Sequence, residues 1–168
     1  ASINAELSEP FISTIINDRY KLNCLLSVAS LINLSIIEGQ KIKNIYKISH
    51  NFLITMFVNR RWFHEYCIFL FQLLKIIGYE IDYKKNNNKK FFDITKLQFN
   101  LDKSYTTIEF PHNLLNKKNL KIKIISVNLV FRIFEEVFVK NHLSNFNLRL
   151  PNHYHLFKKL IIENIKYK

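Results

Sequence analysis

The chain has 168 residues, of which 48% are hydrophobic and 14% aromatic, enough to bury the core of one compact domain and to exclude a disordered protein. It contains only two Gly and three Pro, which excludes a sandwich or barrel of many short strands and favours long helices. The net charge of +12 is uneven, with eight basic and seven acidic residues up to Tyr83 and seventeen basic and six acidic residues from Lys84 onward. A basic second half predicts a polyanionic partner: nucleic acid, an anionic membrane surface or an acidic protein tail.

The first residues predict an extended lead-in rather than a helix. Residues 1–17 contain Pro10 and end in a short apolar run. Asp18 then stands where a helix N-cap belongs, directly before a segment with apolar residues at spacings of three and four. We therefore expect the first helix to begin after Asp18 and to close at Glu38 and Gly39.

Two further helices are predicted before residue 80, over about 40–58 and 60–77. The second of them carries apolar residues around most of its circumference, so we expect it at the centre of a helical bundle. Gly78 is placed to end this helix in the left-handed conformation.

A hydrophilic loop, Lys-Lys-Asn-Asn-Asn-Lys-Lys at 84–90, interrupts the helical pattern. The residues that follow, near 91–110, alternate enough to predict either two short strands or an irregular excursion. Pro111 ends this region. The sequence thus predicts a loop and β excursion over 84–111 inserted into the helical domain.

Two more helices complete the pattern, from about Leu120 to His142 and from Leu150-Pro151 to Ile165, the latter with proline at its first helical position. The prediction is therefore a mainly α protein. We expect a bundle of about five helices over 18–168, a small β excursion near 91–110, and a short extended N-terminal segment over 1–17.

Catalytic patterns are scarce in the sequence. Two glycines are too few for a phosphate-binding loop, and Cys24 and Cys67 lie in apolar helical stretches, as free core thiols do. His153 and His155 are two residues apart on a predicted helix, so their rings point apart and do not form a metal site. We therefore expect a binding protein rather than an enzyme, with no cofactor and no metal.

Clusters of lysine with aromatic neighbours are the main candidates for function. Lysines near phosphates release counterions, and exposed aromatic rings stack on unpaired bases. Phe91 and Phe92 have two interpretations: they stack on bases, or, as we favour, they pack into the bundle while lysines keep the region soluble. The candidate nucleic-acid-binding residues are Lys84, Lys85, Lys89, Lys90, Lys117, Lys118, Lys121 and Lys123.

The segment from Trp62 to Asp82 resembles a known family. Its sharpest part, Leu-Leu-Lys-Ile-Ile-Gly-Tyr at 73–79, is similar to the end of the central helix of the DNA repair and recombination mediator RecO, in its alphaproteobacterial type. The segment 4–12 resembles the strand that leaves the OB-fold of that family, and later helices match in order. The resemblance therefore implies that 1–17 is the remnant or lead-in strand of an N-terminal OB-like domain and that 18–168 is a RecO-like helical domain. Most of the OB-fold is missing, and the excursion 84–92 lacks the cysteines with which many members bind zinc.

The resemblance implies a non-enzymatic mediator that binds single- and double-stranded DNA, anneals strands and promotes recombinase loading. Its implied partners are RecR and the acidic, Phe-terminated C-terminal tail of the single-strand-binding protein. A hydrophobic groove flanked by basic residues would hold that tail. Arg60 and Arg61, at the start of the central helix, are the candidate partner-binding residues.

Two other functions are compatible with the sequence. The first is a basic structural component of a ribonucleoprotein, such as an organellar ribosomal protein, which would place the chain in an organellar matrix. The second is a protein-interaction module that binds an acidic peptide and no nucleic acid. The RecO-like interpretation instead predicts a bacterial cytoplasmic protein associated with the nucleoid. No membrane partner is expected, because the longest uncharged run is too short and too polar to span a bilayer.

Overall fold

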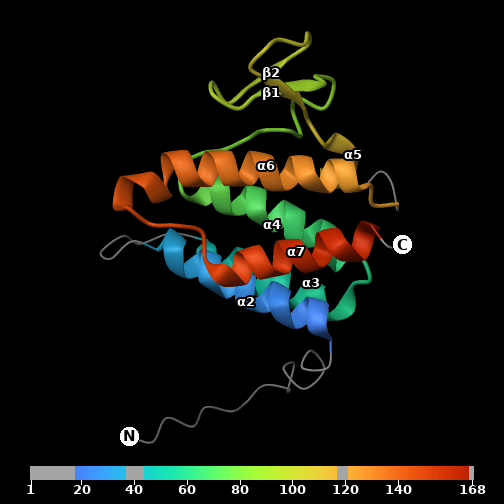
Figure 1. Cartoon of the computed structure of the whole chain (residues 1–168), viewed down its shortest axis with the longest axis vertical. Helices are drawn as coiled ribbons and strands as arrows, with labels where there is room; N and C mark the ends of the chain where they lie inside the picture. The colour runs from blue at the N-terminus through green and yellow to red at the C-terminus, as the bar shows by residue number, and fades with distance from the viewer. Residues whose placement is uncertain (1–17, 37–43, 117–120, 167–168) are drawn as a thin grey trace, which may run out of the picture.

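The computed structural model describes residues 18–36, 44–116 and 121–166, and it is mainly helical with one small antiparallel sheet, as predicted (Figure 1). The predicted extended segment 1–17 lies outside the described residues, as do Lys117, Lys118 and the expected helix end at Glu38 and Gly39. The elements are α2 (Arg19–Ser35), α3 (Ile45–Val58), α4 (Trp62–Ile76), β1 (Phe91–Asp93), β2 (Gln98–Asn100), β3 (Thr107–Glu109), α5 (His112–Leu115), α6 (Ile124–Asn141), the 3-10 helix η1 (Leu143–Phe146) and α7 (Asn152–Lys166).

Helix α4 forms the centre of the bundle, which confirms the prediction made from its apolar circumference. It packs against α3, α5 and α6, while α2 packs along α7. Inside the bundle, the Tyr66 hydroxyl lies 3.2 Å from the Ser27 hydroxyl of α2, so the one polar tip of this ring is paired across two helices. The residues of α4 that are buried are Phe63, His64, Tyr66, Cys67, Phe69, Leu70, Phe71, Leu73 and Leu74.

Two predicted helix ends are confirmed by their hydrogen bonds. The Asp18 carboxylate accepts from the backbone N–H groups of Tyr20 and Lys21 at 3.0 and 3.1 Å, which is an N-cap on α2. Gly78 has φ of 100°, and its N–H donates to Lys75 while the next N–H donates to the Leu74 carbonyl, which is a Schellman ending of α4.

Three predicted helix starts differ from the structure. The helix predicted from residue 40 begins at Ile45, after the left-handed Asn44, although 40–43 lie outside the described residues. The helix predicted from Leu120 begins at Ile124, because Lys123 has an extended backbone. Pro151 precedes α7 rather than opening it, and its carbonyl accepts the first hydrogen bonds of the helix.

The predicted excursion is a three-stranded sheet rather than two strands, in the order β2-β1-β3 (Figure 1). Phe92 at its centre pairs with Phe99 of β2 and with Ile108 of β3. The sequence did not indicate the third strand because each strand has only three residues, too few for an alternation of apolar and polar residues to define a strand. In Figure 1 the sheet lies beyond α6, on the side away from α2 and α3.

An aromatic cluster attaches the sheet to the helices. Phe92 is fully buried and its ring lies 4.9 Å from that of Phe99 and 5.6 Å from that of Phe110, which in turn contacts Phe71 of α4. The preferred interpretation of Phe92 as a packing residue is therefore confirmed. Phe91 is half-buried, and the Lys90 ammonium lies 5.8 Å from its ring centroid.

Both cysteines are buried and free, as predicted. Burial raises the pKa of the Cys24 thiol well above its usual value, and burial also raises the pKa of Cys67. Both side chains therefore remain neutral packing groups rather than nucleophiles.

Candidate nucleic-acid interface

One end of the bundle gathers the starts of several helices. The starts of α2, α4 and α6 and the end of α7 lie together there (Figure 1). Residues of α2, α4 and α7 line one hollow together with Lys121 and Ile122, which precede α6. No side chain caps α4 or α6 by a hydrogen bond, and α6 has no acidic residue in its first turn. Helix α4 carries Glu65 in its first turn, so of these two helices only the positive end of the α6 dipole is left without a local anionic side chain.

The hollow at this end, which we call the terminal groove, has a volume of about 530 Å³. Its apolar side chains are buried or half-buried, whereas Arg60 and Lys121 are exposed. The apolar lining residues are Trp62, Phe63, Ile122, Ile161 and Ile165, and Tyr20, Asn164 and the N-cap Asp18 complete the wall. The terminal groove therefore combines an apolar surface with two cations.

A second hollow of about 440 Å³ lies between the β excursion and α6, and we call it the sheet–helix hollow. Two predicted lysines, Lys90 and Lys123, line it from opposite elements. Lys90 Nζ lies 3.5 Å from Glu109 Oε1, but both side chains are more than half exposed, so this ion pair is weak. Glu109 also lines this hollow, and the other lining residues are Asn87, Asn88, Phe110, Pro111, His112, Asn113, Ile125, Ser126 and Leu129.

The two hollows are connected by a small depression. Lys121 lines both the terminal groove and this depression, and Lys123 lines both the depression and the sheet–helix hollow. Arg60, Lys121, Lys123 and Lys90 therefore follow one another along the surface, and we call them the basic row. Residues from the candidate partner-binding pair and from two candidate nucleic-acid-binding clusters thus meet on one continuous surface.

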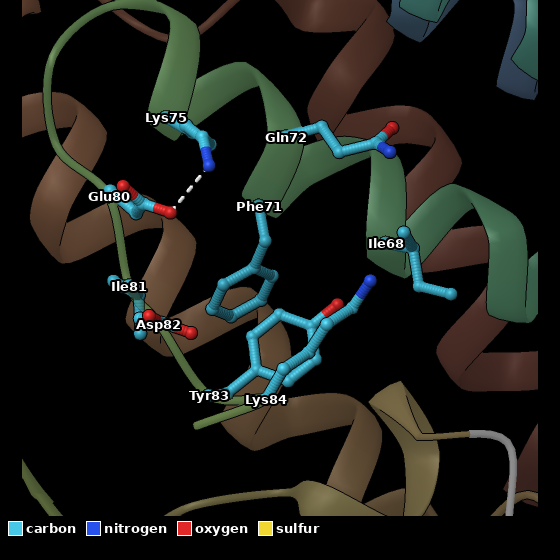
Figure 2. Close-up of a pocket in the computed structure, with 9 residues that line it drawn as sticks. All are labelled: Ile68, Phe71, Gln72, Lys75, Glu80, Ile81, Asp82, Tyr83 and Lys84. Atoms are coloured by element: carbon cyan, nitrogen blue, oxygen red, sulfur yellow. Dashed lines mark hydrogen bonds and ion pairs between the residues drawn. The ribbon is translucent and has the colours of Figure 1, made fainter. Parts of the chain in front are cut away.

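The remaining candidate residues lie elsewhere. Lys84 lines a smaller hollow of about 190 Å³ beside α4, shown in Figure 2. Lys85 Nζ lies 3.2 Å from Asp82 Oδ2, and Lys89 is half-buried. Arg61 is exposed but does not line the terminal groove. The 84–90 loop consequently divides its lysines between two surfaces.

The hollow in Figure 2 offers less to a ligand than the other two. Lys75 Nζ and Glu80 Oε1 lie 2.6 Å apart at its edge, and the hydrogen bond from Lys75 to Glu80 raises the pKa of that lysine. Phe71 and Tyr83 pack edge to face in its wall at 5.8 Å. This hollow is less than half the volume of either of the other two, and its Lys75–Glu80 pair is shorter than the Lys90–Glu109 pair at 3.5 Å, so we place the interface at the larger hollows.

Several residues of the interface were missed by the sequence analysis. His112 is fixed beside the sheet–helix hollow by its Nε2 atom, 2.8 Å from the Lys89 carbonyl oxygen. Because a carbonyl only accepts, Nε2 is the protonated nitrogen of that pair. Trp62 and Ile122 lie 60 positions apart, and only the packing of α4 beside the approach to α6 brings them into one groove. A local pattern does not contain that information.

The described residues include no group of three or more His, Cys, Asp or Glu able to hold a metal ion. Within the same ranges, none of the helices has the length and apolar character needed to cross a bilayer. The chain matches no family model, and no curated protein or solved structure is significantly similar to it.

Proposed function

We propose that the protein is a non-enzymatic DNA repair and recombination mediator of the RecO type, which binds DNA and a protein partner on one end of a helical bundle. The observation that carries this proposal is the basic row, in which Arg60, Lys121, Lys123 and Lys90 succeed one another along connected hollows. Annealing strands and promoting recombinase loading require binding and positioning, so no bond-making group is needed.

A row of cations is suited to a polyanion rather than to a single small anion. Successive phosphates contact successive cations, and each contact releases counterions, so affinity grows steeply as salt falls. The start of α6, which has neither a side-chain cap nor an acidic residue in its first turn, adds a favourable partial charge at the same end. The proposal therefore assigns the DNA backbone to this end of the bundle.

The terminal groove supports the protein partner in this proposal. An acidic peptide that ends in an aromatic residue would place its ring against Trp62 and Ile165 and its carboxylates near Arg60 and Lys121. This is the chemistry of the C-terminal tail of the single-strand-binding protein. RecR is a further expected partner, and the proposed location is the bacterial cytoplasm at the nucleoid.

The test compares two variants of equal charge. In the first, Arg60, Lys121, Lys123 and Lys90 are replaced by Gln, and in the control Lys47, Lys103, Arg132 and Arg149 are replaced by Gln. All eight are exposed, and each variant lowers the net charge from +12 to +8. Binding of fluorescein-labelled single-stranded DNA, duplex DNA and RNA is measured by anisotropy across a salt series.

We expect the basic-row variant to lose DNA affinity and to lower the salt slope by about 3, at ~0.7 per phosphate contact for single strands. The control should keep most of its affinity. Equal losses in both variants would show binding to net charge alone and contradict the proposed surface. Consistently tighter binding to RNA than to DNA would favour the ribonucleoprotein component, and no binding to any polyanion at low salt would contradict both functions.

A further inference from the structure

The sheet–helix hollow shares with the terminal groove a concave surface with two cations and an apolar wall, and it differs in lying between the β excursion and α6. Lys90 approaches it from the β excursion and Lys123 from the start of α6, while Ile125 is 70% exposed at its edge. We propose that this hollow holds one unpaired nucleotide of a single-stranded nucleic acid. The inference rests on the proposed nucleic-acid binding and deepens it, since it names the form of nucleic acid that the site selects.

The phosphate of the nucleotide would lie between Lys90 and Lys123. These two side chains come from segments 33 positions apart and converge on one hollow, so a phosphate there meets cations from two directions. Lys123 is also the N-cap residue of α6 and provides no side-chain cap, so the first N–H groups of α6 face the same region. The weak pair of Lys90 with Glu109 exchanges for the phosphate at little cost.

The base would pack on the apolar side of the hollow. Ile125, Pro111 and Leu129 contribute this wall, and the ring of His112 is held beside it against Phe110 at 4.7 Å. Asn87 and Asn88 also line the hollow, and their side-chain amides would provide donors and acceptors for a base edge. A volume of about 440 Å³ is in the range of small-ligand sites, about 300–1,000 Å³.

Concavity is the reason for single-strand selectivity. In a duplex the bases are stacked and paired, so a protein surface meets the backbone and the base edges in the grooves but not the faces of the bases. To place a base on Ile125 beside a phosphate at Lys123, the nucleotide must leave the stack, which a single strand does at little cost. A duplex can use the lysines but not the apolar wall.

The test uses the full chain with an oligothymidylate of about 16 nucleotides, a blunt duplex of the same length, thymidine monophosphate and inorganic phosphate. Ile125→Ser is compared with the control Ile54→Ser on α3, another exposed isoleucine. The double variant Lys90→Gln/Lys123→Gln is compared with Lys47→Gln/Lys103→Gln. Thermal unfolding is recorded for each variant so that losses of affinity are read only from folded protein.

We expect Ile125→Ser to weaken single-strand binding about threefold and to leave duplex binding unchanged, since only the base contact is removed. The Lys90/Lys123 variant should weaken single-strand binding about tenfold and duplex binding less. The control variants should change the affinity for single strand and for duplex by less than about twofold. Equal losses for strand and duplex would overturn the nucleotide site while leaving polyanion binding intact.

Two other outcomes separate the possible sources of the ligand. A strand gains affinity from neighbouring contacts along the basic row, so unlabelled oligonucleotide should compete with the labelled strand at lower concentrations than thymidine monophosphate or phosphate. Competition by all three at the same concentration would overturn the assignment to a strand. A wild-type protein that binds no oligonucleotide at low salt would overturn the proposed function together with this inference.

Discussion

The Tyr79 hydroxyl donates a hydrogen bond of 2.9 Å to the Asn141 carbonyl oxygen and so joins the end of α4 to the end of α6. At the same end of the bundle, His142 Nε2 lies 2.9 Å from the Leu34 carbonyl oxygen near the end of α2. Helix C-termini are thus tied to one another there, and exposed carbonyls are satisfied within the protein. At the opposite end, where α4 and α6 begin, Arg60, Lys121 and Lys123 are exposed, and α6 starts without a side-chain cap.

Trp62 is the only tryptophan of the chain and lines the terminal groove, so its fluorescence reports on the proposed protein partner. We expect an acidic peptide ending in Phe to shift the Trp62 emission to shorter wavelength as the ring becomes shielded from water. Arg60→Ala should weaken this binding by about 1 kcal/mol or more, because a charge-assisted contact is lost. Arg61→Ala is the control, since Arg61 does not line the groove; equal effects of both changes would place the peptide elsewhere.

The lysines of the 84–90 loop lie on two surfaces, so we expect them to affect DNA affinity differently. Lys84→Gln/Lys85→Gln removes two charges beside α4, and Lys90→Gln/Lys123→Gln removes two from the basic row. We expect the first variant to bind DNA within about twofold of wild type, because Lys85 already faces Asp82 and Lys84 lies off the row. Anisotropy titrations at low salt measure this, and a larger loss from the first variant would move the interface to the face of Figure 2.

Gly78→Ala should destabilise the protein by about 1–2 kcal/mol, because φ of 100° is unfavourable for a residue with a Cβ. A Cβ built at this position meets nothing within 4 Å, so the cost is conformational and not steric crowding by neighbours. Urea unfolding gives the free energies. Gly78→Asn should cost less, since asparagine tolerates positive φ, and an alanine variant as stable as wild type would contradict this account of the helix end.

Asp93 makes the fold of the β excursion sensitive to acid. The Thr106 hydroxyl at 2.6 Å, followed by the N–H groups of Lys96 and Thr95 at 2.9 Å, lowers the pKa of the Asp93 carboxyl. A carboxyl with a lowered pKa stabilises the folded state above its unfolded pKa, about 3.9, and this stabilisation is lost as the pH falls through the folded value.

The amide resonances of Thr95 and Lys96 are expected to shift with an NMR midpoint below the ordinary Asp value. In Asp93→Asn this titration should disappear while the turn still forms, because the amide oxygen retains an acceptor for the two N–H groups. A midpoint at or above the ordinary value in the wild type would contradict the assigned hydrogen bonds.

Glu135 and Glu136 are neighbours in sequence with different expected contributions to stability. Glu135 Oε1 accepts from Lys158 at 2.7 Å and from the Tyr154 hydroxyl at 3.1 Å, and the side chains of the ion pair are only 29% and 24% exposed. Glu135→Ala leaves two partly buried donors without this acceptor and should cost about 1–3 kcal/mol. Glu136→Ala breaks a more exposed pair with Lys140 and should cost less than about 1 kcal/mol. Equal losses in the free energy of unfolding for Glu135→Ala and Glu136→Ala would contradict the expectation that the more buried pair contributes more.

The helices were predictable because local chemistry specifies them. The N-cap Asp18, the positive-φ Gly78 and the apolar circumference of α4 are each readable from a few neighbouring residues. A β excursion near 91–110 was also predicted, but its third strand and the four residues of α5 were not, since elements of three or four residues hold barely more than one period of a pattern. Their positions depend on Phe92 and Phe110 packing against α4, which is a tertiary contact.

The candidate interface was predictable only in part. Composition identified the lysines, but it did not distinguish Lys85, which pairs with Asp82, from Lys90, which reaches the basic row. Nor did it indicate that Lys90 and Lys123 would line one hollow, because the intervening sheet and α5 determine that geometry. Charge counts predict a class of ligand, whereas topology determines which charges act together.

The 84–90 loop is anchored at its C-terminal end. The Lys89 carbonyl contacts His112 Nε2, and the Lys90 carbonyl accepts from the Phe110 N–H at 2.9 Å. When a lysine on an anchored backbone binds a phosphate, only its side chain loses conformational entropy, because the backbone is already fixed. Phosphate binding by Lys90 should therefore have a small entropic cost. Calorimetry should show a more unfavourable binding entropy for His112→Ala than for the wild type, because that change removes the contact with the Lys89 carbonyl.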